Sequence, residues 1–379
     1  MTEKLYYENA YIRSFAANVV EVTSTDKGYD VILDKTAFFP EEGGQSSDTG
    51  YIGDARVSYV YERDGIVHHL TDREPPLGEA NCSLDFEDRF EKMQCHTAEH
   101  ILCGIIHRLF GLDNVGFHLG DDEVTFDVNG VLDREQLNKV EILANEAVFA
   151  NFKIDTIFPT PDELSEIEYR AKLDITEGVR LVRIGDVDTC ACCAPHVAYT
   201  GEIGMIKILD FMKHRGGTRI WMVAGKRALA DYRLRYDNVK RISGMLSAPQ
   251  SEIANVLSDY IAESDETRTA LKQARLRIAE FEAEKIQPTD ASAVFYLPDF
   301  SIPELIAFSN VANKRVGKIT VALSGTDRDY KYVISSNTTD LRAMAKDINS
   351  ALSGRGGGRP EMIQGSFGAT LGEIQDYFK

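Results

Sequence analysis

The feature that most constrains this chain is a pair of short motifs almost a hundred residues apart. His96 and His100 lie in a segment whose apolar residues recur at helical spacing, so both imidazoles are expected on one helix face. Cys192 and His196 repeat the spacing of four in a segment where Pro195 disfavours a regular helix. Three imidazoles and one thiolate suit Zn²⁺. We therefore predict that the two segments converge on one zinc ion.

The cysteine content leaves the ligating sulfur open. Cys190, Cys192 and Cys193 share one short segment, and the spacing from His196 favours Cys192. The six cysteines of the chain show no disulfide framework, which indicates reduced thiols or metal ligands. The first residues lack the basic and apolar regions of a signal peptide, and no apolar run is long enough to span a bilayer. A cytoplasmic protein without a membrane partner is expected.

The charge distribution is uneven. A net charge of −18 argues against a broad nucleic-acid-binding surface, because phosphates repel it. Residues 213–241, however, carry nine Lys/Arg against two Asp. This basic island is either a solvated helix surface with local ion pairs or a localised contact for phosphates.

The pattern of elements predicts a multidomain α+β protein. Short alternating strands separated by Gly and Asp turns predict a small β-barrel in residues 1–88. An α+β zinc-binding domain is expected over residues 89–235, a helical linker over 236–288, and an α/β domain with a glycine-rich loop over 289–379.

Several elements can be placed more closely. Residues 91–110 read as a helix that ends at Gly111, and Asp133 caps a second helix that extends to about residue 151. Residues 123–128 read as a strand. Leu271, Ala274, Ile278 and Phe281 form an apolar stripe that fits either a short coiled coil, which permits a homodimer, or an antiparallel pair with residues 253–261.

Four stretches carry a resemblance to a known family. They are Thr36-Ala37-Phe38-Phe39-Pro40-Glu41-Glu42-Gly43-Gly44-Gln45 with Asp48 and Gly50, His96-Thr97-Ala98-Glu99-His100, Cys192 to His196 followed by Thr200-Gly201-Glu202-Ile203-Gly204, and Gly354 to Gly365. In this order they resemble the long form of the alanyl-tRNA editing proteins (AlaX) over essentially the whole chain. They are also similar to the editing and C-terminal regions of alanyl-tRNA synthetase.

The resemblance implies an aminoacyl-tRNA deacylase that hydrolyses tRNA(Ala) charged with a wrong amino acid, serine or glycine. It implies zinc as cofactor, held by His96, His100, Cys192 and His196, and, through the synthetase, nucleotide and ATP binding. Substrate contacts are expected from Gly43, Gly44, Gln45 and Phe117. Contacts to tRNA are expected from Arg215, Arg219, Lys226, Arg227, Arg355 and Arg359.

Two mechanisms remain open from the residues. In one, zinc binds water or the amino group of the substrate and promotes attack on the ester. In the other, a four-ligand zinc is structural, and water attacks with help from Glu99, His118 or a tRNA hydroxyl. Phe117 cannot bond a serine hydroxyl, whereas His118 can.

Two other functions compete. His96, Glu99 and His100 also match the inverted zinc-peptidase motif, with Glu177 downstream as an acidic third ligand. A non-catalytic tRNA-binding relative of the editing enzymes is the second alternative.

Overall fold

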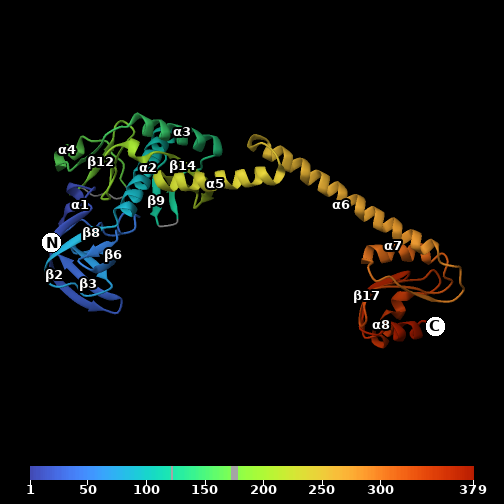
Figure 1. The fold of residues 1–379 in the computed structure, drawn as a ribbon. Helices are drawn as coiled ribbons and strands as arrows, with labels where there is room; N and C mark the ends of the chain where they lie inside the picture. The colour runs from blue at the N-terminus through green and yellow to red at the C-terminus, as the bar shows by residue number, and fades with distance from the viewer. Residues whose placement is uncertain (121–122, 172–177) are drawn as a thin grey trace. The chain divides into compact units, whose positions relative to one another are not determined.

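A computed structural model describes residues 1–120, 123–171 and 178–379, which divide into two compact units, Met1–Val239 and Lys240–Lys379 (Figure 1). The multidomain α+β class predicted from the sequence is confirmed. The four-part division is finer than these two units and stays a prediction. None of the helices in the described part of the chain combines the length and hydropathy that a membrane crossing requires.

The N-terminal half of the first unit is built around a barrel. Its elements are β1 (Glu3–Lys4), α1 (Leu5–Glu8), β2 (Ser14–Thr25), β3 (Gly28–Leu33), β4 (Lys35–Thr36), β5 (Gly50–Ile52), β6 (Ala55–Arg63), β7 (Ile66–Thr71) and β8 (Gly78–Leu84). Six strands close in the order β2-β3-β7-β6-β5-β8, and β8 pairs back with β2. Alternate residues such as Val31, Leu33 and Val57 point inward and form the barrel core.

The other half of this unit packs helices on two antiparallel sheets. Its elements are α2 (Phe86–Phe110), β9 (Asn114–Leu119), β10 (Val124–Val128), α3 (Arg134–Ala150), β11 (Ile154–Ile157), α4 (Pro161–Ser165), β12 (Leu181–Ile184), β13 (Asp188–Ala191), η1 (Thr200–Ile203), β14 (Ile206–His214), β15 (Gly217–Ala224) and α5 (Gly225–Leu246), which runs across the unit boundary. One sheet has the order β14-β15-β10-β9 and the other β11-β12-β13.

Helix α2 is the central element of this half (Figure 1). Its residues are buried from Met93 through Ile106, because the helix lies between the sheets and α3. The predicted caps at Gly111 and Asp133 are confirmed, whereas α2 begins at Phe86, before the predicted start at residue 91. Gly111 caps α2 with a φ of +64°, a conformation that glycine adopts without a Cβ clash. Asp133 caps α3 through a hydrogen bond from the backbone N–H of Gln136.

The second unit contains a mixed five-stranded sheet. Its elements are α6 (Ile253–Glu284), β16 (Ala293–Tyr296), α7 (Ile302–Ala312), β17 (Thr320–Thr326), β18 (Asp329–Ser335), α8 (Leu341–Ala351), β19 (Gly354–Arg359), β20 (Met362–Phe367) and α9 (Leu371–Tyr377). The strand order is β16-β17-β18-β20-β19, and only β16 and β17 run parallel within it.

Two sequence-based expectations for this unit are wrong. The glycine-rich segment is not a loop but the edge strand β19, because glycines in both partners let β19 and β20 approach closely, as at Gly356 and Gly365. Residues 253–261 do not pair antiparallel with the apolar stripe, because both lie in the single helix α6. Leu271 and Ile278 of that stripe are exposed, while Ala279 packs against α7.

Candidate metal centre

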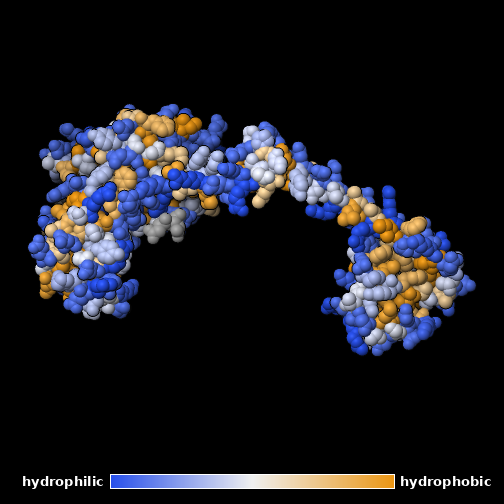
Figure 2. Space-filling model, in the orientation of Figure 1, coloured by the Kyte–Doolittle hydropathy of each residue, from blue (hydrophilic) through white to orange (hydrophobic). Residues whose placement is uncertain are grey.

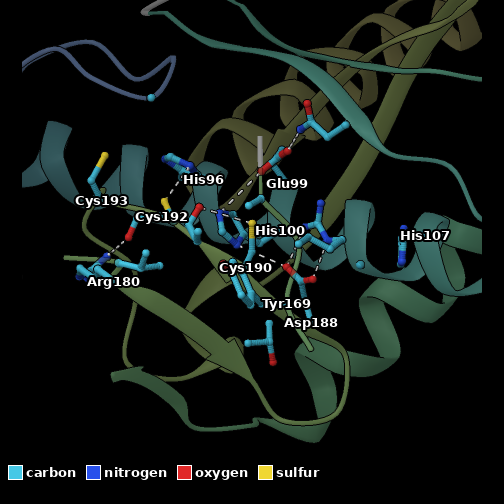
Figure 3. Close-up of a pocket in the computed structure, with 18 of the residues that line it drawn as sticks. His96, Glu99, His100, His107, Tyr169, Arg180, Asp188, Cys190, Cys192 and Cys193 are labelled. Atoms are coloured by element: carbon cyan, nitrogen blue, oxygen red, sulfur yellow. Dashed lines mark hydrogen bonds and ion pairs between the residues drawn. The ribbon is translucent and has the colours of Figure 1, made fainter. Parts of the chain in front are cut away.

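Four predicted ligands converge in the first unit. One donor atom from each of His96, His100, Cys192 and His196 lies within 4.8 Å of the others. Figure 3 shows three of these residues, His96, His100 and Cys192. The sulfur of Cys192 is 3.6 Å from Nε2 of His96 and 3.4 Å from Nε2 of His196. A tetrahedral zinc with ordinary Zn–N and Zn–S bonds separates nitrogen and sulfur by about 3.5 Å. The donors and their spacing therefore fit one zinc ion.

The ligands are brought together by a helix and a strand end. His96 and His100 stand one turn apart on α2. Strand β13 sends alternate side chains to one side, so Asp188 and Cys190 flank His100, and Cys192 follows directly after the strand. All six cysteines of the chain are free thiols, as expected.

The electrostatics distinguish Cys192 from its neighbours. Burial opposes ionisation of its thiol, but the imidazoles of His96 and His196 outweigh burial and hold the pKa of Cys192 well below the usual value. Burial raises the pKa of Cys190 to about 11 and that of Cys193 further still. Of these three thiols, only that of Cys192 has its pKa lowered, in agreement with the ligand that spacing favours.

A hydrogen bond orients the ring of His96. Its Nδ1 lies 2.8 Å from Oε1 of Gln45, which is buried. The other amide atom of Gln45, Nε2, is buried without a hydrogen-bond partner in the described structure. An unpaired buried donor is costly, so Gln45 has one N–H₂ group available beside the cluster.

A buried carboxylate flanks His100. Oδ2 of Asp188 lies 3.4 Å from Nδ1 of His100, and Arg170 donates two hydrogen bonds of 2.7 and 2.8 Å to the same carboxylate. Burial disfavours the charge of Asp188, but Arg170 and His100 together keep its pKa below the usual value. The contact is an ion-pair distance without hydrogen-bond geometry, since Nδ1 of His100 has no hydrogen-bond partner in the described structure. A carboxylate on this side of the ring favours metal binding through the opposite nitrogen.

The glycine motif places Gln45 by close backbone contact. Gly43 and Gly44 have φ values of +64° and +86°. Leu119 of β9 donates to the carbonyl of Gly44 at 2.7 Å. On the same strand, the ring of Phe117 lies 4.7 Å from that of His96. The motif is thus a shaped turn held against β9 and the metal cluster.

The two glycines give a matched prediction. A Cβ at Gly44 would lie 2.3 Å from the carbonyl oxygen of Phe117, whereas a Cβ at Gly43 meets only the sulfur of Cys193 at 3.6 Å. Gly43→Ala is expected to cost about 1–2 kcal/mol, from left-handed backbone strain alone, and Gly44→Ala clearly more. Urea unfolding followed by fluorescence of Trp221, the one tryptophan of the chain, measures both. Equal costs would contradict this packing.

The two predicted catalytic side chains differ in position. Glu99 is buried and lines the cavity beside the cluster. Asn114 and Cys103 both donate to its Oε1, so Oε2 is the oxygen that faces His100, 4.0 Å from Nε2. His118 is exposed, and as the neighbour of Phe117 on β9 it projects to the opposite side of the strand. The structure therefore brings Glu99 to the cluster and leaves His118 away from it.

A cavity of about 1110 Å³ opens beside the cluster. His96, His100 and Cys192 form part of its wall together with both polar and aromatic side chains, including Tyr7, Phe158, Tyr169, Arg170 and Arg180 (Figure 3). Such a cavity is large enough for a nucleoside-sized group. Glu177, the acidic ligand that the peptidase hypothesis needs, lies outside the described residues.

Most of the predicted tRNA contacts in the first unit are internally paired. The exception is Arg215, which is exposed in the turn between β14 and β15. The visible part of α5 is strongly hydrophilic (Figure 2), yet the first two cations of α5 and Arg219 of β15 bind neighbouring groups. The pairs are Arg219 with Asp127, Lys226 with Glu87, and Arg227 with Glu91 and the carbonyl of Gly120. Of the two interpretations of the basic island, local ion pairing therefore applies to Arg219, Lys226 and Arg227.

The remaining two predicted contacts lie in the second unit. Arg355 and Arg359 are both exposed on the edge strand β19. Arg355 donates to Ser366 at 3.4 Å. These two cations belong to a strand edge rather than to a phosphate-cradling loop.

Sequence reasoning missed four side chains that support the cluster. Asp188 could have been found, because it precedes Cys190 by two residues and so shares its side of a strand. Arg170, Arg180 and Asn114 gave no local signal. Arg180 donates to the carbonyls of Cys192 and Ala194 at 2.7 and 2.9 Å and so holds the ligand loop.

Comparison with known proteins agrees with this geometry. Residues 179–221 match the model of the threonyl and alanyl tRNA synthetase second additional domain, and residues 2–80 match that of class II (A) tRNA synthetases. The chain is 26% identical to alanyl-tRNA editing protein AlaX-L of Pyrococcus horikoshii, covering 99% of this chain and 97% of that protein.

Longer relatives match as well. The chain is 31% identical to the alanine–tRNA ligase of Hyperthermus butylicus, covering 96% of this chain and 42% of the ligase. It is 33% identical to that of Halobacterium salinarum, with 86% and 38% covered. The chain thus spans about two fifths of these ligases. The solved C-Ala domain of Aquifex aeolicus alanyl-tRNA synthetase is 18% identical and covers 23% of this chain and 84% of that domain, with a TM-score of 0.20 that supports no argument about fold. The chain is thus similar end to end to an alanyl-tRNA editing protein of the AlaX type, and part of it matches a domain model shared by threonyl and alanyl tRNA synthetases.

Proposed function

We propose that this protein is a trans-editing hydrolase that deacylates tRNA(Ala) mischarged with serine or glycine. One observation carries the proposal. In a chain that aligns end to end with an alanyl-tRNA editing protein, three imidazoles and a thiolate converge within 4.8 Å, and His96, His100 and Cys192 of this cluster form part of the wall of a large cavity. The substrate is an activated ester at the 3′ end of the tRNA, and the reaction is its hydrolysis.

Zinc is the cofactor that these residues would hold. His96, His100, Cys192 and His196 supply borderline and soft donors of the kind that zinc prefers. When bound there, zinc would supply Lewis-acid polarisation or would fix the pocket. Hydrolysis of an activated ester needs no phosphate donor, so ATP binding, expected from the ligase resemblance, has no role in this reaction.

One side chain at the cavity wall, that of Glu99, has the chemistry to act on the ester. The Oε2 of Glu99 can accept the proton of an attacking water, since its partner oxygen is already occupied by Asn114 and Cys103. The exposed His118 is not part of this proposal.

The tRNA itself would be gripped largely by exposed cations such as Arg215, Arg355 and Arg359, since the others are paired.

A deacylation panel tests the proposal. The purified full-length protein is incubated with Ser-tRNA(Ala), Gly-tRNA(Ala) and Ala-tRNA(Ala), and loss of the aminoacyl ester is followed over time. Serine and glycine esters are expected to be hydrolysed well above the spontaneous rate, and the alanine ester much more slowly. Intact zinc binding with no hydrolysis of any charged tRNA would support a non-catalytic tRNA-binding protein instead.

A further inference from the structure

Thr97 connects the two halves of the metal cluster. It lies next to His96 on α2, is fully buried, and its Oγ1 is 3.0 Å from Nδ1 of His196, which is 99 residues away in the chain. The same oxygen lies 2.7 Å from the carbonyl oxygen of Met93, one turn earlier in the helix. The backbone N–H of Val197 approaches it at 3.4 Å.

These contacts leave only one arrangement of hydrogens. A threonine hydroxyl has a single hydrogen to donate. The carbonyl of Met93 can only accept, so it takes that hydrogen. The lone pairs of Oγ1 then face Nδ1 of His196 and the N–H of Val197, and both must donate to it. Nδ1 of His196 therefore carries a hydrogen.

The tautomer of His196 decides whether it can bind a metal. A neutral imidazole with its hydrogen on Nδ1 has its lone pair on Nε2. Nε2 of His196 is the nitrogen that faces the sulfur of Cys192, at 3.4 Å. The other tautomer would place a hydrogen in the position that a cation must occupy.

We propose that Thr97 is a positioning residue that locks His196 in the Nδ1–H tautomer and so prepares Nε2 for zinc. This inference rests on the proposed zinc site but not on the deacylase activity. Burial supports it, because Thr97 is 0% and His196 only 5% exposed, which limits competition from solvent for this hydrogen bond. The bond from Val197 also ties the ligand loop to α2, so one hydroxyl sets both the tautomer and the position of the ring.

Two variants of Thr97 separate the hydrogen bond from packing. Thr97→Val keeps the volume and removes the acceptor, whereas Thr97→Ser keeps the acceptor. Loss of such an outer partner lowers metal affinity by about 10–100-fold in other sites. We expect that loss in Thr97→Val and near wild-type affinity in Thr97→Ser. Affinity is measured on the full-length protein by competition with a chromophoric zinc chelator.

A spectroscopic readout reports the tautomer directly. Long-range ¹H–¹⁵N correlation spectra of histidine-labelled, metal-free full-length protein distinguish Nδ1–H from Nε2–H, and the His196 signals are assigned by their loss in His196→Gln. The wild type and Thr97→Ser are expected to show Nδ1–H. Thr97→Val is expected to show the other tautomer or a mixture.

Thr200 provides a matched control. It is equally buried, donates to the carbonyl of Ala147 at 2.7 Å and accepts from the N–H of Phe152 at 2.9 Å, but contacts no histidine in the described structure. Thr200→Val is expected to lose stability without changing the tautomer or zinc affinity. Unchanged tautomer and affinity in Thr97→Val would overturn the inference and leave the deacylase proposal intact. If the deacylation panel shows no activity, the deacylase proposal is overturned and the inference about Thr97 stays intact.

Discussion

Cys192→Ser is expected to abolish stoichiometric zinc binding and to reduce deacylation of Ser-tRNA(Ala) by more than about 100-fold. Serine remains a neutral hydroxyl at pH 7, whereas the thiol of Cys192 has its pKa held far below normal by His96 and His196. Loss of a direct ligand should exceed the roughly 10–100-fold cost in affinity of losing an outer hydrogen-bond partner. Zinc content after dialysis and the deacylation rate are the two measurements.

The adjacent residue is the control for this variant. Cys193→Ser makes the same atomic change one position away, at a thiol whose pKa is raised and which lies to one side of the histidines (Figure 3). It is expected to keep zinc and activity. Zinc loss from Cys193→Ser with retention by Cys192→Ser would reassign the sulfur ligand. Full deacylation by a zinc-free Cys192→Ser protein would remove zinc from the mechanism.

Arg89→Met is expected to destabilise the first unit by about 3–5 kcal/mol, the usual cost of leaving a buried charge without its partner. Arg89 is 1% exposed and donates to both carboxylate oxygens of Asp48. It also donates to the carbonyls of Ala10 and Ala37. These bonds tie the barrel and the Gln45 loop to the first turns of α2. Urea unfolding followed by Trp221 fluorescence measures the loss.

Two further variants keep this prediction testable. Arg108→Met makes the same change at an exposed position of α2 and is expected to alter stability by less than about 0.5 kcal/mol. Arg89→Met combined with Asp48→Leu removes both charges and should recover part of the loss, even if the single variant folds poorly. Equal stability of Arg89→Met and wild type would mean that this ion pair does not join the barrel to α2.

The metal cluster was largely predictable because its signal is local. Spacings of four residues placed His96 beside His100 and Cys192 beside His196. The preference of zinc for imidazole and thiolate donors then predicted that the two pairs share one ion. The helices were predictable for a similar reason, since Gly111 and Asp133 act as caps within one turn of their helices. Such signals need only neighbouring residues.

Other features depended on partners far away in the chain. Nothing local showed that Arg219 would pair with Asp127, or that Glu99 would be buried rather than surface-exposed. The segment around Gly356 looked like a loop because glycine is common there, and it became a strand only through its pairing with β20. Glycine adopts both loop and strand conformations, so pairing with β20 determined that this segment forms a strand.

The spacings of the candidate ligands, the caps at Gly111 and Asp133 and the resemblance to the alanyl-tRNA editing proteins were thus determined by the sequence alone, because each rests on short-range geometry or on recognisable motifs. Tertiary structure alone decided which thiol has its pKa lowered, which cations are already paired, and which nitrogen of His196 carries its hydrogen. Those properties follow from burial and from the atoms brought within about 3–4 Å. For His196, the deciding atom belongs to Thr97, 99 positions away.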